Sequence, residues 1–307
     1  MDFLHRTVRD FLQDNYYSQL HVNLKGQFGS MPALCRIFLV MLKSLPNVDF
    51  KAAPSINKVF GLTDELLYYA YETEQIDQNT VSSLVDVLDE VDRVNTHYAH
   101  GARNHWTHAR DEVGELGLDV YREGGKYNFL ALTVQARLVK YVRAKLDANP
   151  KNLRKGGRPL LDYALRPRRI TPMSMSYHSK RDDPSVNVDM VRLLLERGAD
   201  PNQPVHLNDS KSIWYLFLLS MHETVNRVRV GNTRPSTSLT SAWYQSCELL
   251  IHHGARKNSY EFEGGEERAD YGIFLHLFGS AKADALVALM NEKEREGQQG
   301  KGSCMIM

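Results

Sequence analysis

The sequence predicts an all-α fold: a helical region to about residue 125, followed by an array of helix pairs to about residue 290. Apolar residues recur at three- and four-residue spacing, whereas no segment alternates for long between apolar and polar residues. Two segments, Met190–Asn202 and Cys247–Asn258, each read as a short helix with one apolar face that ends at Gly-Ala. Because so short a helix cannot bury its face alone, two copies indicate stacked repeats.

Composition bounds the class of protein. The 307 residues are 42% hydrophobic, which is enough for a core of one large or two ordinary domains. With 38 basic and 37 acidic residues the net charge is +1, so no general attraction to nucleic acid or anionic membranes is expected. The three cysteines lie far apart and form no disulfide or zinc pattern, which indicates a reducing compartment. We therefore expect a soluble, cytoplasmic protein.

The first 125 residues contain five amphipathic or buried segments. In residues 2–14 the apolar positions share one helical face. Further helices are expected at 31–45, with Pro32 in the first turn, and at 64–75, 80–95 and 106–121. The helix at 80–95 carries several acids on its outer side, which we interpret as a solvated face (Asp86, Asp89, Glu90 and Asp92).

From residue 126 to 290 the pattern predicts four helix pairs. The paired segments are 129–134 with 138–146, 158–164 with 190–197, 212–220 with 246–253, and 271–278 with 283–290. Gly198 stands where a helix needs a left-handed cap, and Pro201 prevents continuation. Long loops are expected as insertions near 166–188 and 224–241. Residues 291–307 are charged and then Gly/Gln/Ser-rich, so a flexible tail is predicted.

The repeat helices resemble ankyrin repeats. Pro159, Leu160 and Ala164 match that family's Thr-Pro-Leu-His-x-Ala helix start, and Val191–Asn202 matches its second helix and turn. Arg158 and Leu161 depart from the pattern, so the usual hydrogen bonds at that start are expected to be lost. The Gly-Ala pairs at 198 and 254 lie 56 residues apart, against a usual period of about 33. The resemblance therefore implies an irregular ankyrin-like solenoid.

The stretch Phe3–Leu12 resembles a segment of fungal NACHT-type (STAND) signalling NTPases, located after their nucleotide-binding domain. In those proteins a helical region and degenerate ankyrin-like repeats follow. The resemblance implies that this chain is the sensor or scaffold arm of such a protein without its NTPase domain. Consistent with this, no Gly-x-x-x-x-Gly-Lys-Ser/Thr phosphate loop with a strand before it and a helix after it occurs.

No motif of a catalytic, cofactor or metal site is recognised, and we predict no enzyme activity and no cofactor. One cluster leaves an alternative open, because His97, His100, His105 and His108 could place imidazoles on shared helical faces. A metal-dependent enzyme is thus a competing hypothesis. Cys35 and Cys247 are expected to be small buried hydrophobes. The basic residues between Lys151 and Arg169 are interpreted as solvated loops around a core helix, with a local anion or nucleic-acid contact as the alternative.

The last four residues, Cys304-Met305-Ile306-Met307, fit a prenylation signal of the farnesyl type. A single lipid gives weak membrane residence, and no second cysteine or basic cluster lies nearby. A prenylated peripheral membrane adaptor is therefore the second alternative.

The sequence as a whole favours a non-enzymatic protein–protein interaction module with unidentified protein partners. Aromatic residues of the repeat helices are expected to fill the core, with one or two facing a partner (Trp214, Tyr215, Phe217, Trp243 and Tyr244). The sequence does not say which of them bind.

Overall fold

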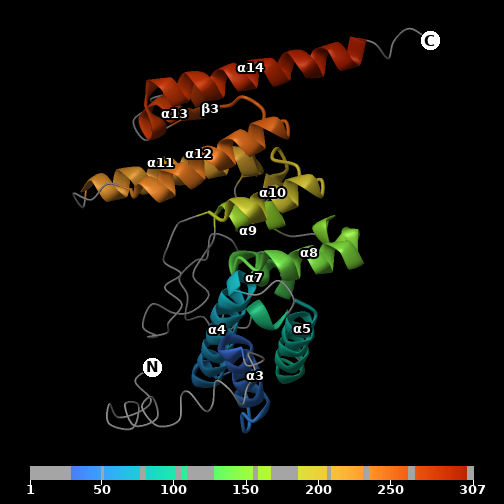
Figure 1. Cartoon of the computed structure of the whole chain (residues 1–307). Helices are drawn as coiled ribbons and strands as arrows, with labels where there is room; N and C mark the ends of the chain where they lie inside the picture. Colours follow the sequence, from blue (N-terminus) through green and yellow to red (C-terminus); the bar gives the residue numbers. More distant parts are fainter. Residues whose placement is uncertain are drawn as a thin grey trace, which may run out of the picture.

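The computed structural model describes residues 29–49, 52–76, 81–100, 105–108, 128–154, 158–166, 186–205, 209–230, 235–261 and 267–302. In this part of the chain the fold is all-α, as predicted, with two short two-stranded antiparallel sheets. Figure 1 shows the helices arranged in successive tiers, from α3, α4 and α5 at one end to α13 and α14 at the other.

The elements begin and end as follows. The first tier contains α3 (Ser30–Lys43), α4 (Ala53–Ile76), α5 (Val81–Tyr98) and the 3₁₀ turn η1 (Trp106–His108). The helix pairs are α7 (Phe129–Gln135) with α8 (Val139–Ala148), α9 (Leu160–Leu165) with α10 (Val188–Glu196), α11 (Ile213–Val230) with α12 (Thr237–His252), and α13 (Asp270–Phe278) with α14 (Ser280–Gly302). The turn η2 (Pro150–Arg154) follows α8, and the hairpins are β1 (Pro204–Val205) with β2 (Lys211–Ser212) and β3 (Ser259–Glu261) with β4 (Glu267–Ala269).

The helix pairs stack in register. The first helices contact one another in chain order, α7 with α9, α9 with α11, and α11 with α13. The second helices do the same, α8 with α10, α10 with α12, and α12 with α14. Each of the two hairpins lies between the second helix of one pair and the first helix of the next. The helices of the four pairs thus form two rows of contacts in chain order.

Side chains at several helix starts supply N-caps. Asn128, Asn187 and Ser236 precede α7, α10 and α12, and each side chain accepts the backbone N–H three residues on. The Ser212 hydroxyl likewise accepts the Tyr215 N–H at the start of α11, at 3.1 Å. These bonds satisfy N–H groups that have no partner within the helix.

The predicted glycine cap of α10 is confirmed, and α12 ends in the same way. Gly198 has φ +91° and Gly254 has φ +86°. The Gly198 N–H donates to Leu195 O and the Ala199 N–H to Leu194 O, at 2.9 and 3.0 Å. The equivalent bonds from Gly254 and Ala255 are also 2.9 and 3.0 Å. Both ends are Schellman motifs, which require a left-handed residue.

Replacing Gly198 by alanine is expected to lower the free energy of unfolding by about 1–2 kcal/mol, the cost of the left-handed conformation for an L residue. No atom lies within 4 Å of the added Cβ, so no clash adds to this cost. Urea denaturation of the full chain measures it. Gly254→Ala, with nearly the same φ and equally open surroundings, should cost the same. Wild-type stability in the Gly198→Ala protein would contradict the assignment.

Two predicted irregular segments are helical instead. Of the insertion expected near 224–241, residues 224–230 continue α11 and residues 237–241 begin α12. The extra length therefore extends an antiparallel helix pair, whose far end reaches beyond its neighbours in Figure 1. The tail expected from residue 291 instead continues α14 to Gly302. Residues 292–296 are strong helix formers, and Lys257 Nζ reaches Asn291 Oδ1 and Glu294 Oε2, both at 2.7 Å.

Other boundaries differ from the sequence prediction in smaller ways. The helix expected at 64–75 begins at Ala53, with Pro54 in its first turn, where its missing N–H costs nothing. The helix expected at 106–121 begins as the three-residue turn η1, and residues 109–127 lie outside the described part. Most of the insertion near 166–188 also lies outside it.

A single hydrophobic core runs through all tiers. Its buried side chains extend from Cys35 in α3 to Met290 in α14. Trp106 joins the two expected domains, because its ring contacts Phe60 of α4 and Phe129 of α7. The core is therefore continuous across the predicted boundary at residue 125.

Candidate interaction surface

A carboxylate of the first tier caps α8, the second helix of the first pair. Glu74, near the end of α4, accepts the backbone N–H groups of Lys140 and Tyr141, at 3.0 and 2.9 Å. These belong to the first turn of α8, whose own N-cap, Leu138, has no side-chain hydrogen bond. The Lys140 ammonium in turn donates to Glu74 O at 2.6 Å. A negative charge at a helix N-terminus is favourable, so Glu74 stabilises the start of α8.

Burial raises the pKa of Glu74, and the hydrogen bonds from Lys140 and Tyr141 work against this rise. Glu74 is 6% exposed. A buried carboxylate at this position needs both N–H donors, because an ionised group without partners is costly in the interior.

The acidic face predicted on α5 is not simply solvated. Asp89 accepts the Tyr141 hydroxyl at 2.7 Å and pairs with Lys145 at 2.9 Å, both on α8. Asp92 accepts the Trp106 indole N–H at 2.7 Å and lies 3.2 Å from His105 Nε2. Glu90 pairs with Lys43 and Arg93, which holds its pKa below the usual value. Three of the four acids thus join α5 to other elements, and Asp86 is exposed.

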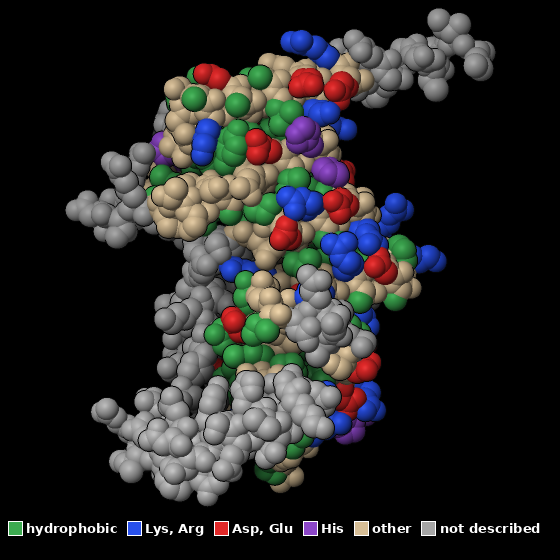
Figure 2. All heavy atoms as spheres, in the orientation of Figure 1, with side chains coloured by type: hydrophobic (Ala, Val, Ile, Leu, Met, Phe, Trp, Pro, Cys, Tyr) green, Lys and Arg blue, Asp and Glu red, His purple; other side chains and the backbone are tan. Residues whose placement is uncertain are grey.

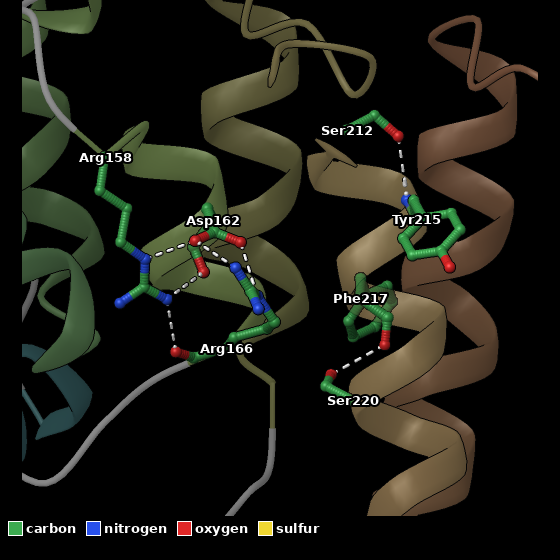
Figure 3. A network of polar contacts seen from close by, with 7 residues as sticks. All are labelled: Arg158, Asp162, Arg166, Ser212, Tyr215, Phe217 and Ser220. Atoms are coloured by element: carbon green, nitrogen blue, oxygen red, sulfur yellow. Dashed lines mark hydrogen bonds and ion pairs between the residues drawn. The ribbon is translucent and has the colours of Figure 1, made fainter. Parts of the chain in front are cut away.

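The pair α9–α10 contains a buried ionic cluster, shown in Figure 3, which we call the arginine clamp: Arg158, Asp162 and Arg166. Arg158 Nε donates to Asp162 Oδ2, and Arg166 donates to both carboxylate oxygens at 2.7 Å. Arg158 Nη2 also donates to the carbonyls of Asp162 and Arg166, at 3.1 and 2.9 Å. The exposed fractions of the three side chains are 2%, 0% and 8%.

Burial by itself would raise the pKa of Asp162, but the guanidinium groups of Arg158 and Arg166 outweigh it and hold the pKa below its ordinary value. Arg158 also stacks over the Tyr163 ring, 4.1 Å from its centroid. The start of α9, where the usual ankyrin hydrogen bonds were expected to be lost, therefore has hydrogen bonds from Arg158 instead. Arg158 and Arg166, which were expected in solvated loops, are instead buried and paired with Asp162.

A polar link joins successive second helices on the outer edge of the stack. Arg197, after α10, pairs with Asp147 of α8. Asn202 accepts the Arg256 N–H at 2.9 Å and donates to Gly254 O at 2.8 Å, which ties the turn after α10 to the turn after α12. Lys257 then reaches α14. Figure 2 shows basic, acidic and histidine side chains interspersed on this side, over α8, α10 and α12.

The first helices differ in what they leave exposed. Every residue of α7 and of α9 is buried, so these helices have no free surface for a partner. In α13, by contrast, Tyr271 and Leu275 are 40% and 43% exposed, one helical turn apart. On α11, Glu223 and Asn226 are exposed. We call the exposed residues of these two helices, Tyr271 and Leu275 of α13 with Glu223 and Asn226 of α11, the α11–α13 face.

The aromatic residues singled out in the sequence separate into two groups. Trp214, Phe217 and Trp243 are buried at 2% exposure or less. Tyr215 and Tyr244 are partly exposed, and each has a lysine over its ring, Lys211 at 4.8 Å and Lys282 at 4.9 Å. Periodicity could not separate the groups, because all five stand at helical positions. Tyr271 and Leu275 were missed because an apolar residue at helical spacing reads as core.

A second apolar area lies at the opposite end of the stack. On α3, Ile37, Val40 and Met41 are 52%, 60% and 46% exposed and share one side of the helix. The opposite side buries Cys35, Phe38 and Leu42 against the rest of the first tier. Ile76, at the end of α4, is also exposed, at 72%.

The histidine cluster is not assembled as a metal site in the described residues. His97 and His100 are exposed at the end of α5, whereas His105 contacts Asp92 and the Thr107 hydroxyl. The side chain of His108 lies outside the described part. Among the residues that the structure describes, no three His, Cys, Asp or Glu side chains are close enough to hold a metal ion.

The structure describes two of the three cysteines. Cys35 and Cys247 are buried free thiols, as expected. Burial raises the pKa of Cys35 to about 11 and that of Cys247 well above its usual value, so both stay protonated at neutral pH. Cys304 lies outside the described residues. No helix in the described ranges has the length and apolar character needed to cross a bilayer.

Comparison with known proteins gives one match. Residues 1–52 match a family model described as a domain of unknown function, DUF7791. That range includes the segment Phe3–Leu12 and all of α3. No curated protein matches the chain, and no solved structure matches it.

Proposed function

We propose that this chain is a non-enzymatic protein–protein interaction module. The observation that carries the proposal is the stack of four helix pairs in one register, with α7 and α9 wholly buried and the α11–α13 face left open. Stacked repeats form an extended, rigid surface whose side chains can change without disturbing the core. A rigid surface binds at a lower entropic cost than a flexible one.

The α11–α13 face has the composition of a binding site. Tyr271 combines an apolar ring with a hydroxyl, and burial of Leu275 beside it would remove apolar area from water. Tyrosine is enriched among residues that dominate binding energy at interfaces. The hairpin β3–β4 directly precedes α13, so a partner on this face would contact both.

A finer assignment follows from the resemblances. We infer that the helix pairs are degenerate ankyrin-like repeats, and that the chain serves as the sensor or scaffold arm of a fungal NACHT-type signalling protein. The two Schellman ends at Gly-Ala and the hairpin between consecutive pairs support the first inference. The family match over 1–52 includes the stretch that resembles NACHT-type proteins, although its description names no function. An in-frame phosphate loop upstream in the gene would support the second inference.

The experiment for the interaction function is comparative affinity capture with the full chain, using an extract of the cells that express it. Leu275→Asp should reduce recovery of a specific partner by at least about tenfold, because a charge in the centre of an apolar contact is poorly desolvated. Ile76→Asp is the matched control, since it makes the same kind of change on an exposed residue of α4. Both substitutions should leave the melting temperature nearly unchanged.

Two outcomes would contradict this picture. If wild type, Leu275→Asp and Ile76→Asp recover the same partner equally, the α11–α13 face is not the binding site. If none of them recovers any protein above the level of an unrelated bait, the interaction function is wrong.

A second candidate, a prenylated peripheral membrane adaptor, rests on Cys304-Met305-Ile306-Met307. Farnesylation would form a thioether at the Cys304 sulfur, and Met305–Met307 would normally be removed. The intact mass of protein from eukaryotic cells distinguishes the modified from the encoded C-terminus. A Cys304→Ser protein that partitions into membranes as wild type does would reject the lipid as the cause of any membrane contact.

A further inference from the structure

The exposed stripe on α3 is unusual within this structure. Among the described residues, six large hydrophobic side chains are exposed, and three of them, Ile37, Val40 and Met41, stand together on one helix. Their spacing of three and four residues places them on one side of α3. An apolar stripe of this kind on an otherwise polar surface marks a contact site.

We propose that this stripe is the docking site of residues 3–12 of the same chain. That segment precedes α3 and has the complementary pattern, with apolar residues at helical spacing (Phe3, Leu4, Val8, Phe11 and Leu12). A ten-residue helix is about 15 Å long, and α3, with 14 residues, is about 21 Å long. The two apolar faces are therefore of similar length, and the stripe on α3 is exposed to water.

The connection permits this contact. Sixteen residues separate Leu12 from Gly29, at the start of α3. Fully extended, they span up to about 50 Å, more than twice the length of α3. The segment can therefore lie along α3 in either direction, and tethering keeps its effective concentration high.

The family match supports one unit rather than two. A single family model covers residues 1–52, so it includes both the segment 3–12 and all of α3 and ends before α4. Two amphipathic elements that recur together, joined by a short connection, form a helical hairpin that buries both apolar faces. This inference concerns the end of the chain opposite the α11–α13 face and does not depend on the proposed function.

Hydrogen exchange on the full chain tests the docking. In wild type, amides of residues 3–12 should exchange slowly, and Val40→Asp should make them exchange at least about tenfold faster, because docking is what keeps an isolated short helix formed. Ile76→Asp is the matched control and should leave these rates unchanged. Phe11→Asp, placed in the segment itself, should have the effect of Val40→Asp.

Light scattering on the same proteins distinguishes docking of residues 3–12 from binding of a second copy of the chain. The inference is overturned if residues 3–12 exchange at the same rate in wild type and Val40→Asp. It is also overturned if wild type is a dimer that Val40→Asp converts to a monomer while exchange at 3–12 stays unchanged, because the stripe then binds a second copy.

Discussion

Asp162→Ala is expected to lower the free energy of unfolding by about 3–5 kcal/mol, the typical cost of removing one partner from a buried ion pair. Without the carboxylate, the guanidinium groups of Arg158 and Arg166 would remain in the interior, at 2% and 8% side-chain exposure, with no opposite charge in the clamp. Equilibrium urea denaturation of the full chain, followed by circular dichroism, measures the change.

The control for Asp162 is another aspartate that pairs with an arginine. Asp189 and Arg192 form an ion pair at 2.7 Å, but their side chains are 73% and 47% exposed. Asp189→Ala should therefore cost less than about 1 kcal/mol. Equal effects of the two substitutions would show that burial is not what gives the arginine clamp its importance.

The clamp also predicts a pH dependence. Because the folded-state pKa of Asp162 is lowered, its contribution to stability is complete above the ordinary value of 3.8 and is lost as pH falls through the folded value. The stability difference between wild type and Asp162→Asn should therefore shrink in acid. A difference that grows as the pH falls would contradict the assigned direction.

Glu74→Ala is expected to cost about 2–4 kcal/mol, since it removes two hydrogen bonds to a carboxylate and leaves buried N–H groups without an acceptor. The affected groups, Lys140 N and Tyr141 N, open α8, so the loss should fall on the junction between the first tier and the helix pairs. Urea denaturation gives the size of the loss. Hydrogen exchange gives its place, with faster exchange expected in α8.

Two variants of the same region sharpen this test. Glu74→Gln keeps one acceptor oxygen and should lose less than Glu74→Ala. Gln75→Ala, at the exposed neighbouring position, should change stability by less than about 0.5 kcal/mol. Unchanged exchange in α8 of the Glu74→Ala protein would mean that the helix does not depend on this cap.

The sequence predicted local structure better than contacts between tiers. Gly198 could be assigned because a left-handed cap depends only on its own φ angle and on the few residues before it. The role of Glu74 could not be predicted, because the N–H groups that donate to its carboxylate lie 66 and 67 residues away. The acids of α5 look solvated on a helical wheel, and only the position of α8 makes Asp89 an interhelical partner. The candidate surface depends on the same information, since exposure of Leu275 is decided by which neighbours cover α13.

The insertion near 224–241 was misjudged for a different reason. Polar residues with Gly231 and Pro235 suggest a loop over the whole stretch, because such residues favour turns. Residues 224–230 and 237–241 are mostly Thr, Val and Ser, which have low intrinsic helix propensity, yet they belong to α11 and α12, so local preference is overridden here.

The extended end of the α11–α12 pair has a consequence for how this protein can vary. In Figure 1 the far end of α11 and α12 reaches beyond the helices of the neighbouring pairs. Adding or removing a turn from both helices together would change the reach of this arm by about 5.4 Å per turn. The stack would keep its register, because the added residues lie outside it. The length of the α11–α12 pair can therefore vary without changing the contacts between neighbouring helix pairs.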